Sequence, residues 1–312
     1  MNRLVIIGNG FDLAHGLPTS YKDFIDDYWK TACNTNGGKK IDYKDNLVAI
    51  NCEFGYLIND DEMLAIEKIN NFQEINNFIN RNKSKRDGVF EIKFHNNFYK
   101  IICESSTENW VDIENLYYDI LKNISNSDFR KYNYPWGVNQ LNNEFGDVKS
   151  LLEKYLIDNI EEKFEFKSND IIETLNIFKP KTYIGNELNE LYNEISIKSK
   201  KRIEEEYQLK VQKSTGFSTN NFSGQKIHIT NYFLSFNYTS TMKKYIDFLK
   251  IDNGDLNEIH GSVIEKLNPI NFGFGDEMDN DYKQIEDKND NEYLKNIKSF
   301  QYLHTQNYKR LL

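Results

Sequence analysis

The sequence predicts an α/β protein whose parallel sheet is built from the N- and C-terminal segments of the chain. The apolar run Leu4–Ile7 has the length of a buried parallel strand and ends at a glycine turn. A second apolar and aromatic run, Tyr232–Phe236, also reads as a strand. The residues between these runs are mostly polar and helical in pattern. We therefore expect a nucleotide-binding core of residues 1–30 plus 226–312, and a mainly helical insertion or cap of residues 31–225.

The first section reads as strand, glycine turn and helix. The helix is expected to begin near Thr19 or Ser20, since both residues are good N-caps. Its apolar face is formed by the side chains Phe24, Ile25, Tyr28 and Trp29.

The insertion carries one well-marked helix, Trp110–Ile124, whose apolar residues recur at helical spacing. Asp112 and Glu114 lie near its start, where negatively charged carboxylates interact favourably with the helix dipole. Further helices are expected at 59–82, 147–164 and 185–213, the last being highly charged and able to project as a hairpin arm. Residues 214–225 form a loop by composition.

The last section returns to α/β character. We expect a helix over Thr239–Leu249, a short strand end and turn at Glu258–Gly261, and another strand over 269–275 that runs into a glycine turn.

Composition narrows the class of protein. Hydrophobic residues make up 39% and aromatic residues 14% of the chain, which is enough for a core. A net charge of −9 argues against general nucleic-acid binding and against binding to anionic membranes, because both depend on clustered Lys and Arg. The basic stretch Lys198–Arg202 is interpreted as a solvated helix face.

The three cysteines, Cys33, Cys52 and Cys103, form no C-x-x-C pair, so a structural zinc site is not expected. Free thiols suit a reducing compartment, and Leu4–Ile7 is too short for a signal peptide or a membrane span. A cytoplasmic protein is therefore expected. An acidic patch follows the last glycine turn and reads as a solvated loop, with metal binding left open: Asp276, Glu277, Asp279 and Asp281.

The glycines after the first strand suggest a phosphate site. Glycine lets the backbone approach a ligand closely, and backbone N–H groups can then face a phosphate. The spacing is not the dinucleotide G-x-G-x-x-G, because Leu13 stands where the third glycine is needed. The candidate cofactor-binding residues are Gly8, Asn9, Gly10, Phe11, Gly16, Leu17 and Pro18, with Gly273 and Gly275 from the C-terminal glycine turn.

Two polar residues follow the later strands. Asn237 comes after the strand at 232–236, and His260 follows the short strand end at 258. In a doubly wound sheet, residues just past the carboxyl ends of strands line the ligand crevice. Each residue alone also fits an ordinary turn or cap.

Taken in order, these motifs resemble the AbiH family of bacterial abortive-infection proteins. The resemblance rests on G-N-G-F-D-x-A-x-G-L-P-T-x-Y at 8–21, W-x-D-x-E at 110–114, F-N-Y-T at 236–239, I-H-G at 259–261 and F-G-F-G at 272–275. The order of glycine motif, Asn, His-Gly and glycine turn is also similar to the sirtuin-like NAD-binding fold.

The resemblance implies binding of NAD or a related ADP-ribosyl compound. Our hypothesis is that the protein cleaves the bond between nicotinamide and ribose. His260 would act as general base. Asn237 would orient the ribose or the attacking water. Asp12, which stands where sirtuins carry a serine, would contact a ribose hydroxyl or stabilise positive charge; a cap on the following turn is the simpler interpretation. Gly16 and Pro18 would shape the loop, and Glu114 would lie at the pocket rim or be solvated.

Two departures from the sirtuin pattern keep other functions open. The four-cysteine zinc module of sirtuin deacylases is absent, and no G-x-S-L motif is found before Lys309–Leu312, which suggests an incomplete C-terminal sheet. One alternative is a non-catalytic sensor of NAD or ADP-ribose whose insertion contacts a phage-derived or host protein. The other is a nuclease or nucleotide hydrolase, although no Walker A motif is present. A homo-oligomer is also left open.

Overall fold

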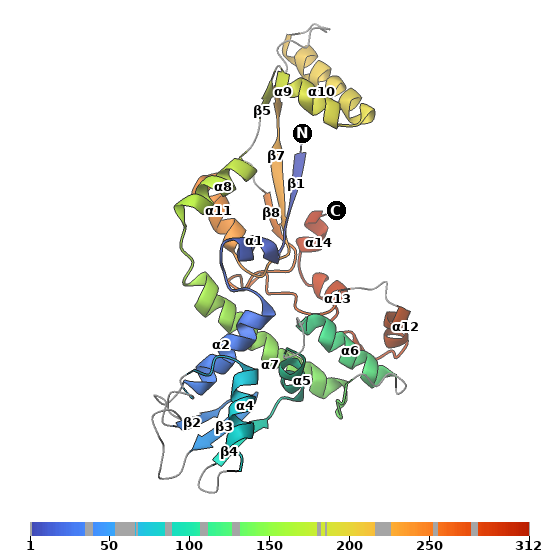
Figure 1. Cartoon of the computed structure of the whole chain (residues 1–312). Coiled ribbons are helices and arrows are strands. Elements are labelled where there is room, and N and C mark those ends of the chain that lie inside the picture. Colours follow the sequence, from blue (N-terminus) through green and yellow to red (C-terminus); the bar gives the residue numbers. More distant parts are fainter. Residues whose placement is uncertain are drawn as a thin grey trace. The chain divides into compact units, whose positions relative to one another are not determined.

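A computed structural model describes residues 2–34, 40–53, 66, 68–84, 89–106, 112–126, 132–179, 182–184, 186–215, 226–251, 255–275 and 280–311 (Figure 1). The chain divides into two compact units. The first unit comprises Met1–Gly8, Glu165–Phe236 and Ser240–Ile259, and the second comprises Asn9–Phe164, Asn237–Thr239 and His260–Leu312. The boundaries expected from the sequence, at residues 30 and 226, stay a prediction.

The first unit contains a parallel sheet made from distant parts of the chain. Strands β1 (Asn2–Ile7), β7 (Thr230–Ser235) and β8 (Asp255–Glu258) lie in the order β1-β7-β8. Leu4 is in register with Tyr232, which in turn is in register with Asp255. Helix α11 (Thr241–Leu249) connects β7 to β8 along the chain. The expected parallel sheet of an α/β protein, joining the N- and C-terminal segments, is confirmed.

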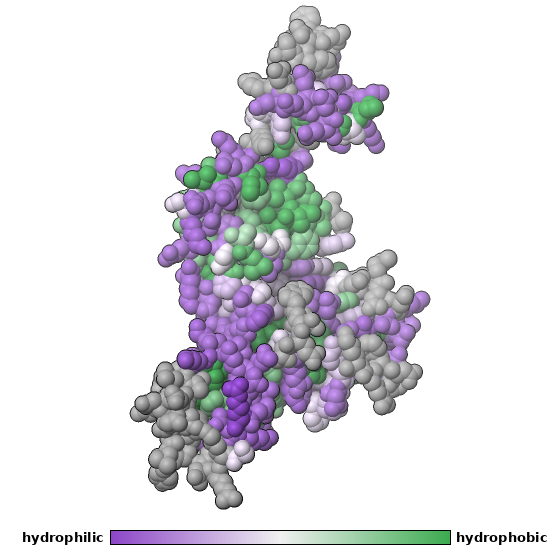
Figure 2. Space-filling view, in the orientation of Figure 1, coloured by the Kyte–Doolittle hydropathy of each residue, from purple (hydrophilic) through white to green (hydrophobic). Residues whose placement is uncertain are grey.

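Strand β1 is less buried than its apolar sequence predicts. Ile7 is only 3% exposed, but Leu4 is 57% and Ile6 65% exposed. In the described part of the chain β1 is an edge strand, so its side chains lack the second neighbouring strand that a central strand would have. Figure 2 shows a hydrophobic area where Figure 1 places β1 and β7, in keeping with the exposed leucine and isoleucine of β1.

The charged segment expected as one helix at 185–213 forms two helices, α9 (Asn186–Glu194) and α10 (Ile197–Thr215). Helix α10 begins after Ser196, whose hydroxyl accepts a hydrogen bond from the Ser199 amide at 3.2 Å. Strand β5 (Thr182–Ile184) precedes α9 in the chain, and strand β6 (Lys226–His228) follows α10. The two strands pair antiparallel.

Helix α8 (Ser168–Phe178) packs on the parallel sheet of the first unit. The ring of Phe178 lies 5.5 Å from that of Phe233, between centroids. The Phe178 carbonyl accepts a hydrogen bond from the Asn231 side chain at 2.6 Å.

The second unit is built around helix α2 (Tyr21–Cys33). Ser20 is its N-cap, and Ser20 and Asp23 form a capping box, as the sequence signal near Thr19 and Ser20 predicts. The four expected apolar residues are buried, and Trp29 is fully enclosed.

The second unit also contains an antiparallel sheet that the sequence analysis missed. It has the order β2 (Lys40–Lys44), β3 (Val48–Glu53), β4 (Val89–Phe94). The Asp45 carboxylate accepts hydrogen bonds from the Leu47 and Val48 amides, both at 2.8 Å, which fixes the turn between β2 and β3.

Of the helix expected at 59–82, residues 72–82 are helical, residues 68–71 are not, and most of the rest lies outside the described residues. The helices expected at 110–124 and 147–164 are found over 113–125 and 138–156. Asp112 caps α6 by accepting hydrogen bonds from the Glu114 and Asn115 amides, while Trp110 lies outside the described residues. Besides α2, the helical elements of the second unit include α1 (Asn9–Ala14), α4 (Phe72–Asn82), α5 (Asn97–Ser106), α6 (Ile113–Ser125), α7 (Val138–Leu156), a π-helical turn (Ile157–Glu161), α12 (Asn280–Glu286), a 3₁₀ turn (Asn291–Tyr293), α13 (Lys298–Tyr302) and α14 (Asn307–Leu311).

The strand expected at 269–275 is wrong. Only Phe274 forms a ladder contact, a single parallel bridge to Ile297. The neighbouring backbone groups are used elsewhere, since the Asn271 amide donates to the His260 carbonyl at 2.7 Å and the Gly273 amide donates to Glu114 at 2.9 Å. Among the described residues, the rest of the segment has no strand partner.

Candidate functional site

The opening glycine motif forms a helix and its C-terminal cap. Helix α1 ends in a Schellman motif, in which the Leu17 amide donates to the Asp12 carbonyl at 3.1 Å and the Gly16 amide donates to the Leu13 carbonyl at 2.9 Å. Gly16 has a φ of 70°, the left-handed conformation that this cap requires. Gly16 therefore shapes the loop, as its position before Leu17 and Pro18 predicts.

Replacing Gly16 with alanine is expected to destabilise the protein by about 1–2 kcal/mol, because an L-residue is strained at positive φ. Urea denaturation would measure the loss. Gly146→Ala is the matched control, since a Cβ there meets nothing within 4 Å and helix propensity favours alanine. A Gly16→Ala protein as stable as that control would contradict this role.

The motif residues around the cap contact each other. The Thr19 hydroxyl donates to the Asn9 side chain at 2.6 Å, and the Pro18 carbonyl accepts from the Tyr155 hydroxyl at 2.6 Å. A Cβ placed on Gly8 or on Gly10 would meet no atom within 4 Å, so open space lies beside both glycines. Phe11 packs on His15, with ring centroids 4.4 Å apart.

Asp12 joins the opening motif to the F-N-Y-T motif. Its Oδ2 accepts a hydrogen bond from the Thr239 hydroxyl at 2.5 Å, and both residues are buried, Asp12 with 1% of its surface exposed. Asn237, two residues before Thr239, is also buried. Asp12 and Thr239, 227 positions apart in the sequence, are thus held together inside the second unit.

Glu114 lies at the centre of a buried polar cluster. Its Oε1 accepts hydrogen bonds from the Tyr238 hydroxyl and the Gly273 amide, both at 2.9 Å. Lys298 Nζ lies 3.0 Å from Oε1, and the side chains of Glu114 and Lys298 are only 17% and 10% exposed. Glu114 is therefore not a solvated carboxylate, because it is ion-paired and accepts hydrogen bonds from two further segments, and its place at the rim of a pocket stays a prediction.

The phenols around this carboxylate stay protonated. Burial, and then the charge of Glu114, raises the pKa of Tyr238 and of Tyr21 well above the ordinary value. The same two causes raise the pKa of Tyr302 to about 12. Near neutral pH these tyrosines donate hydrogen bonds and do not act as bases.

His260 lies between two of these aromatic rings. Its ring centroid is 6.0 Å from that of Tyr238 and 6.2 Å from that of Tyr302, nearly parallel to the latter. The next residue, Gly261, has a φ of 77°, and a Cβ there would lie 2.1 Å from the Pro269 carbonyl oxygen. The His-Gly pair therefore places a partly exposed imidazole on a sharply constrained turn.

Residues 4–310 match the family described as bacteriophage abortive infection AbiH. The chain belongs to the AbiH family. Its family thus associates it with abortive infection, a defence against bacteriophage. No curated protein and no solved structure matches the chain.

Two of the expected cofactor-binding residues in this AbiH chain have close protein neighbours. A Cβ on Gly273 would lie 2.0 Å from the Asn296 carbonyl oxygen, and one on Gly275 would lie 3.2 Å from the Lys298 side chain. The backbone contact explains why position 273 is glycine, whereas the Lys298 side chain beside Gly275 is flexible. The proposed contact of both residues with a cofactor stays a prediction.

The described residues contain no group of three or more His, Cys, Asp or Glu side chains that could hold a metal ion. Of the acidic patch, Asp276, Glu277 and Asp279 lie outside the described residues, and Asp281 lies 3.8 Å from Lys122. Within the described ranges, no helix has the length and hydropathy of a membrane span.

Two residues of the site in this AbiH chain, Tyr238 and Lys298, were not predicted from the sequence. Tyr238 stands inside F-N-Y-T, so a closer interpretation of that motif could have found it. Lys298 is 184 residues from its partner Glu114, and no local pattern marks it.

Proposed function

We propose that this AbiH protein acts in the cytoplasm by binding NAD, on a sirtuin-like arrangement of its motifs, and by hydrolysing the bond between nicotinamide and ribose. The observation that supports this most directly is the meeting of three motifs in one compact unit. Asp12 contacts Thr239 at 2.5 Å, and Tyr238 lies between Glu114 and the His260 ring.

The opening motif offers room for a ligand. The open space beside Gly10 lets a diphosphate approach the backbone, and such an approach needs no net basic charge. Asn9 and Thr19 hold the two sides of the motif together through their side-chain hydrogen bond. NAD and other ADP-ribosyl compounds carry such a diphosphate, so they are the ligands that we propose for this space.

In the proposed reaction, the C–N bond to ribose breaks and nicotinamide leaves with the bonding electrons. Water adds to the ribose carbon, and His260 takes the proton of that water as general base. The neighbouring phenols cannot take this role because their pKa values are raised. Asn237 orients the water or the ribose, and Asp12 holds the F-N-Y-T loop through Thr239.

Loss of NAD would stop the growth of an infected cell, which fits an abortive-infection family. A phage-derived or host protein would serve as the trigger.

The test is release of nicotinamide from NAD by the purified protein. His260→Ala and Asn237→Ala are each expected to lower turnover by roughly 100-fold or more, the usual contribution of a general base or its orienting group. His304→Ala is the matched control, because His304 is exposed and should leave turnover unchanged. Wild-type rates in both site variants would refute the mechanism.

A binding experiment separates the enzyme from a non-catalytic sensor. Gly10→Val places a side chain in the open space beside the motif, so it should abolish NAD binding in calorimetry while the thermal midpoint is kept. NAD binding without turnover in the wild type would favour a sensor. Unchanged binding by Gly10→Val would contradict the proposed ligand site.

A further inference from the structure

A row of aromatic rings begins at His260 in the second unit. The ring of Tyr302 lies 6.2 Å from that of His260, between centroids, and is tilted by only 14° against it. The ring of Tyr308 follows at 6.1 Å from Tyr302, tilted by 11°. Nearly parallel rings at such distances are in the offset-stacked arrangement that aromatic side chains prefer. The three rings therefore form one aromatic row, which starts at the proposed general base.

The outer end of the aromatic row is open to solvent. Tyr308 is 48% exposed, whereas His260 and Tyr302 are partly buried. One face of the Tyr308 ring is turned toward Tyr302, which leaves the other face for a ligand. The position of the ring is fixed by its neighbour Asn307, which is 6% exposed and donates a hydrogen bond to the Asn268 side chain at 2.6 Å. Tyr308 is thus a planar surface held in place.

The charges around this end of the row suit an anionic ligand. Residues 293–311 include four Lys and Arg residues and no Asp or Glu, although the net charge of the chain is −9. Lys309 and Arg310, which follow Tyr308 directly, are exposed. Proteins hold nucleotides with this combination, because the aromatic ring stacks on the base and the cations attract the phosphates. The outer end of the aromatic row therefore has the chemistry of a nucleotide-binding surface.

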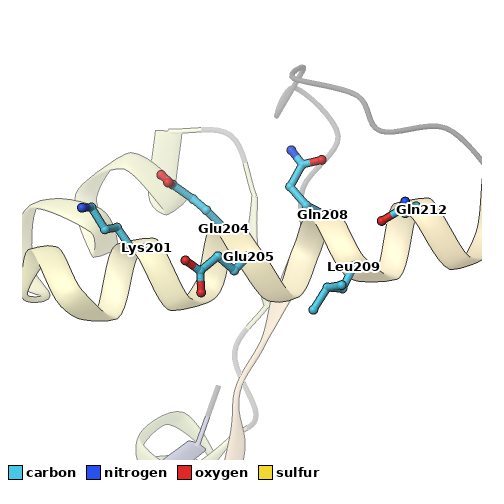
Figure 3. Close-up of a pocket in the computed structure, with 6 residues that line it drawn as sticks. All are labelled: Lys201, Glu204, Glu205, Gln208, Leu209 and Gln212. Carbon is cyan, nitrogen blue, oxygen red and sulfur yellow. The ribbon is translucent and has the colours of Figure 1, made fainter.

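A groove along helix α10 offers different chemistry. It has a volume of about 550 Å³ and is lined by charged, amide and aliphatic side chains (Figure 3): Lys201, Glu204, Glu205, Gln208, Leu209 and Gln212. None of these six has an aromatic ring on which a base could stack, and two of them are carboxylates that repel a phosphate. Between these two surfaces, the aromatic row is the one that suits a nucleotide.

We infer that Tyr308 stacks on the adenine ring of the NAD or ADP-ribosyl compound whose ribose is held at His260. The inference rests on the proposed function and adds the place where the far end of the ligand binds. Nicotinamide leaves at His260, so adenine is the base that stays on the ligand, and Tyr308 is the exposed ring at the other end of the row. Stacking uses the face of the base, so a hypoxanthine ring in place of adenine should also bind.

Calorimetry with ADP-ribose tests the stacking, because this compound lacks the nicotinamide bond and is not consumed. Tyr308→Ala should weaken its binding about tenfold. Tyr308→Phe and Tyr308→Trp should keep the binding, since the ring and not the hydroxyl makes the contact. Nicotinamide mononucleotide, the half of NAD without adenine, should bind the wild type and Tyr308→Ala equally. Tyr232→Ala is the matched control, because Tyr232 is a 40% exposed tyrosine of the first unit and should leave ADP-ribose binding unchanged.

Kinetics separate this inference from the proposed hydrolysis. Tyr308→Ala should raise the KM for NAD about tenfold at an unchanged kcat, whereas His260→Ala should lower kcat. Wild-type affinity of Tyr308→Ala for ADP-ribose would overturn the inference and leave the hydrolysis standing. Binding of ADP-ribose that depends on Tyr308, without turnover of NAD, would keep the inference and refute the hydrolysis. A wild type that binds neither compound would overturn both.

Discussion

Replacing Lys298 with methionine is expected to lower the free energy of unfolding by about 3–5 kcal/mol, because it leaves the Glu114 carboxylate buried without its counter-charge. Lys298 Nζ lies 3.0 Å from Glu114, and both side chains are largely removed from water. Removing the Lys298 ammonium also leaves Glu114 held only by the hydrogen bonds that it accepts from Tyr238 and Gly273. Urea denaturation of the two proteins would give the difference.

Lys295 provides the control within the same segment. It forms an ion pair with Glu292 at 3.7 Å, but its side chain is 54% exposed. Exposed pairs contribute about 0–1 kcal/mol, so Lys295→Met should change stability by less than 1 kcal/mol. A Lys298→Met protein as stable as Lys295→Met would show that the buried pair contributes little.

A double-mutant cycle isolates the pair itself. Glu114→Gln alone leaves the ammonium of Lys298 buried and should also be costly. The double variant Glu114→Gln/Lys298→Met removes both charges, so its loss should be clearly smaller than the sum of the two single losses. Additive losses would mean that the two residues stabilise the protein independently.

This pair also shows where sequence analysis of the chain stops. Capping residues and apolar periodicity are local signals, and they correctly predicted helix α2 at Ser20, strand β7 before Asn237 and the turn at His260. The partner of Glu114 is set by how distant segments pack, and no spacing rule encodes it. Asp12 and the F-N-Y-T segment are in contact through Thr239, a pairing that the spacing of the motifs does not encode, and the proposed roles of Asp12 and Asn237 stay predictions.

The strand predictions that proved wrong also concern features set by the packing of distant segments. Exposure of Leu4 and Ile6 depends on which strands lie beside β1, and an apolar run alone cannot reveal this. Residues 269–275 have a strand-like sequence, but Glu114 and the His260 carbonyl take up amides that a neighbouring strand would otherwise bind. Strands β2 and β3 alternate buried and more exposed residues, with Ile41 and Tyr43 inward in one and Val48, Ile50 and Cys52 inward in the other. A search for a period of two could therefore have found them.

Raising the pH is expected to unfold the protein steeply above pH 9. Burial raises the pKa of the Cys33, Cys52 and Cys103 thiols to about 12, with the neighbouring Cys52 thiol as a second cause at Cys33. Below the ordinary thiol pKa of about 8.5 both states keep their protons, so stability does not depend on these groups. Above it the unfolded chain loses the protons that the folded chain retains, so stability falls until about pH 12.

The slope of the free energy of unfolding against pH follows from the number of thiols. Each contributes a loss of about 1.4 kcal/mol per pH unit, so the three together remove about 4 kcal/mol per unit in this window. A typical stability of about 5–15 kcal/mol would be lost within a few pH units. Urea midpoints at intervals from pH 8 to pH 11 measure the slope, and alkylation should leave all three thiols unmodified at pH 8 until the chain unfolds. Replacing all three cysteines with alanine should flatten the slope between pH 8 and 9, where tyrosines of ordinary pKa about 10 are still protonated. An unchanged slope in that window would assign alkaline unfolding to groups other than these thiols.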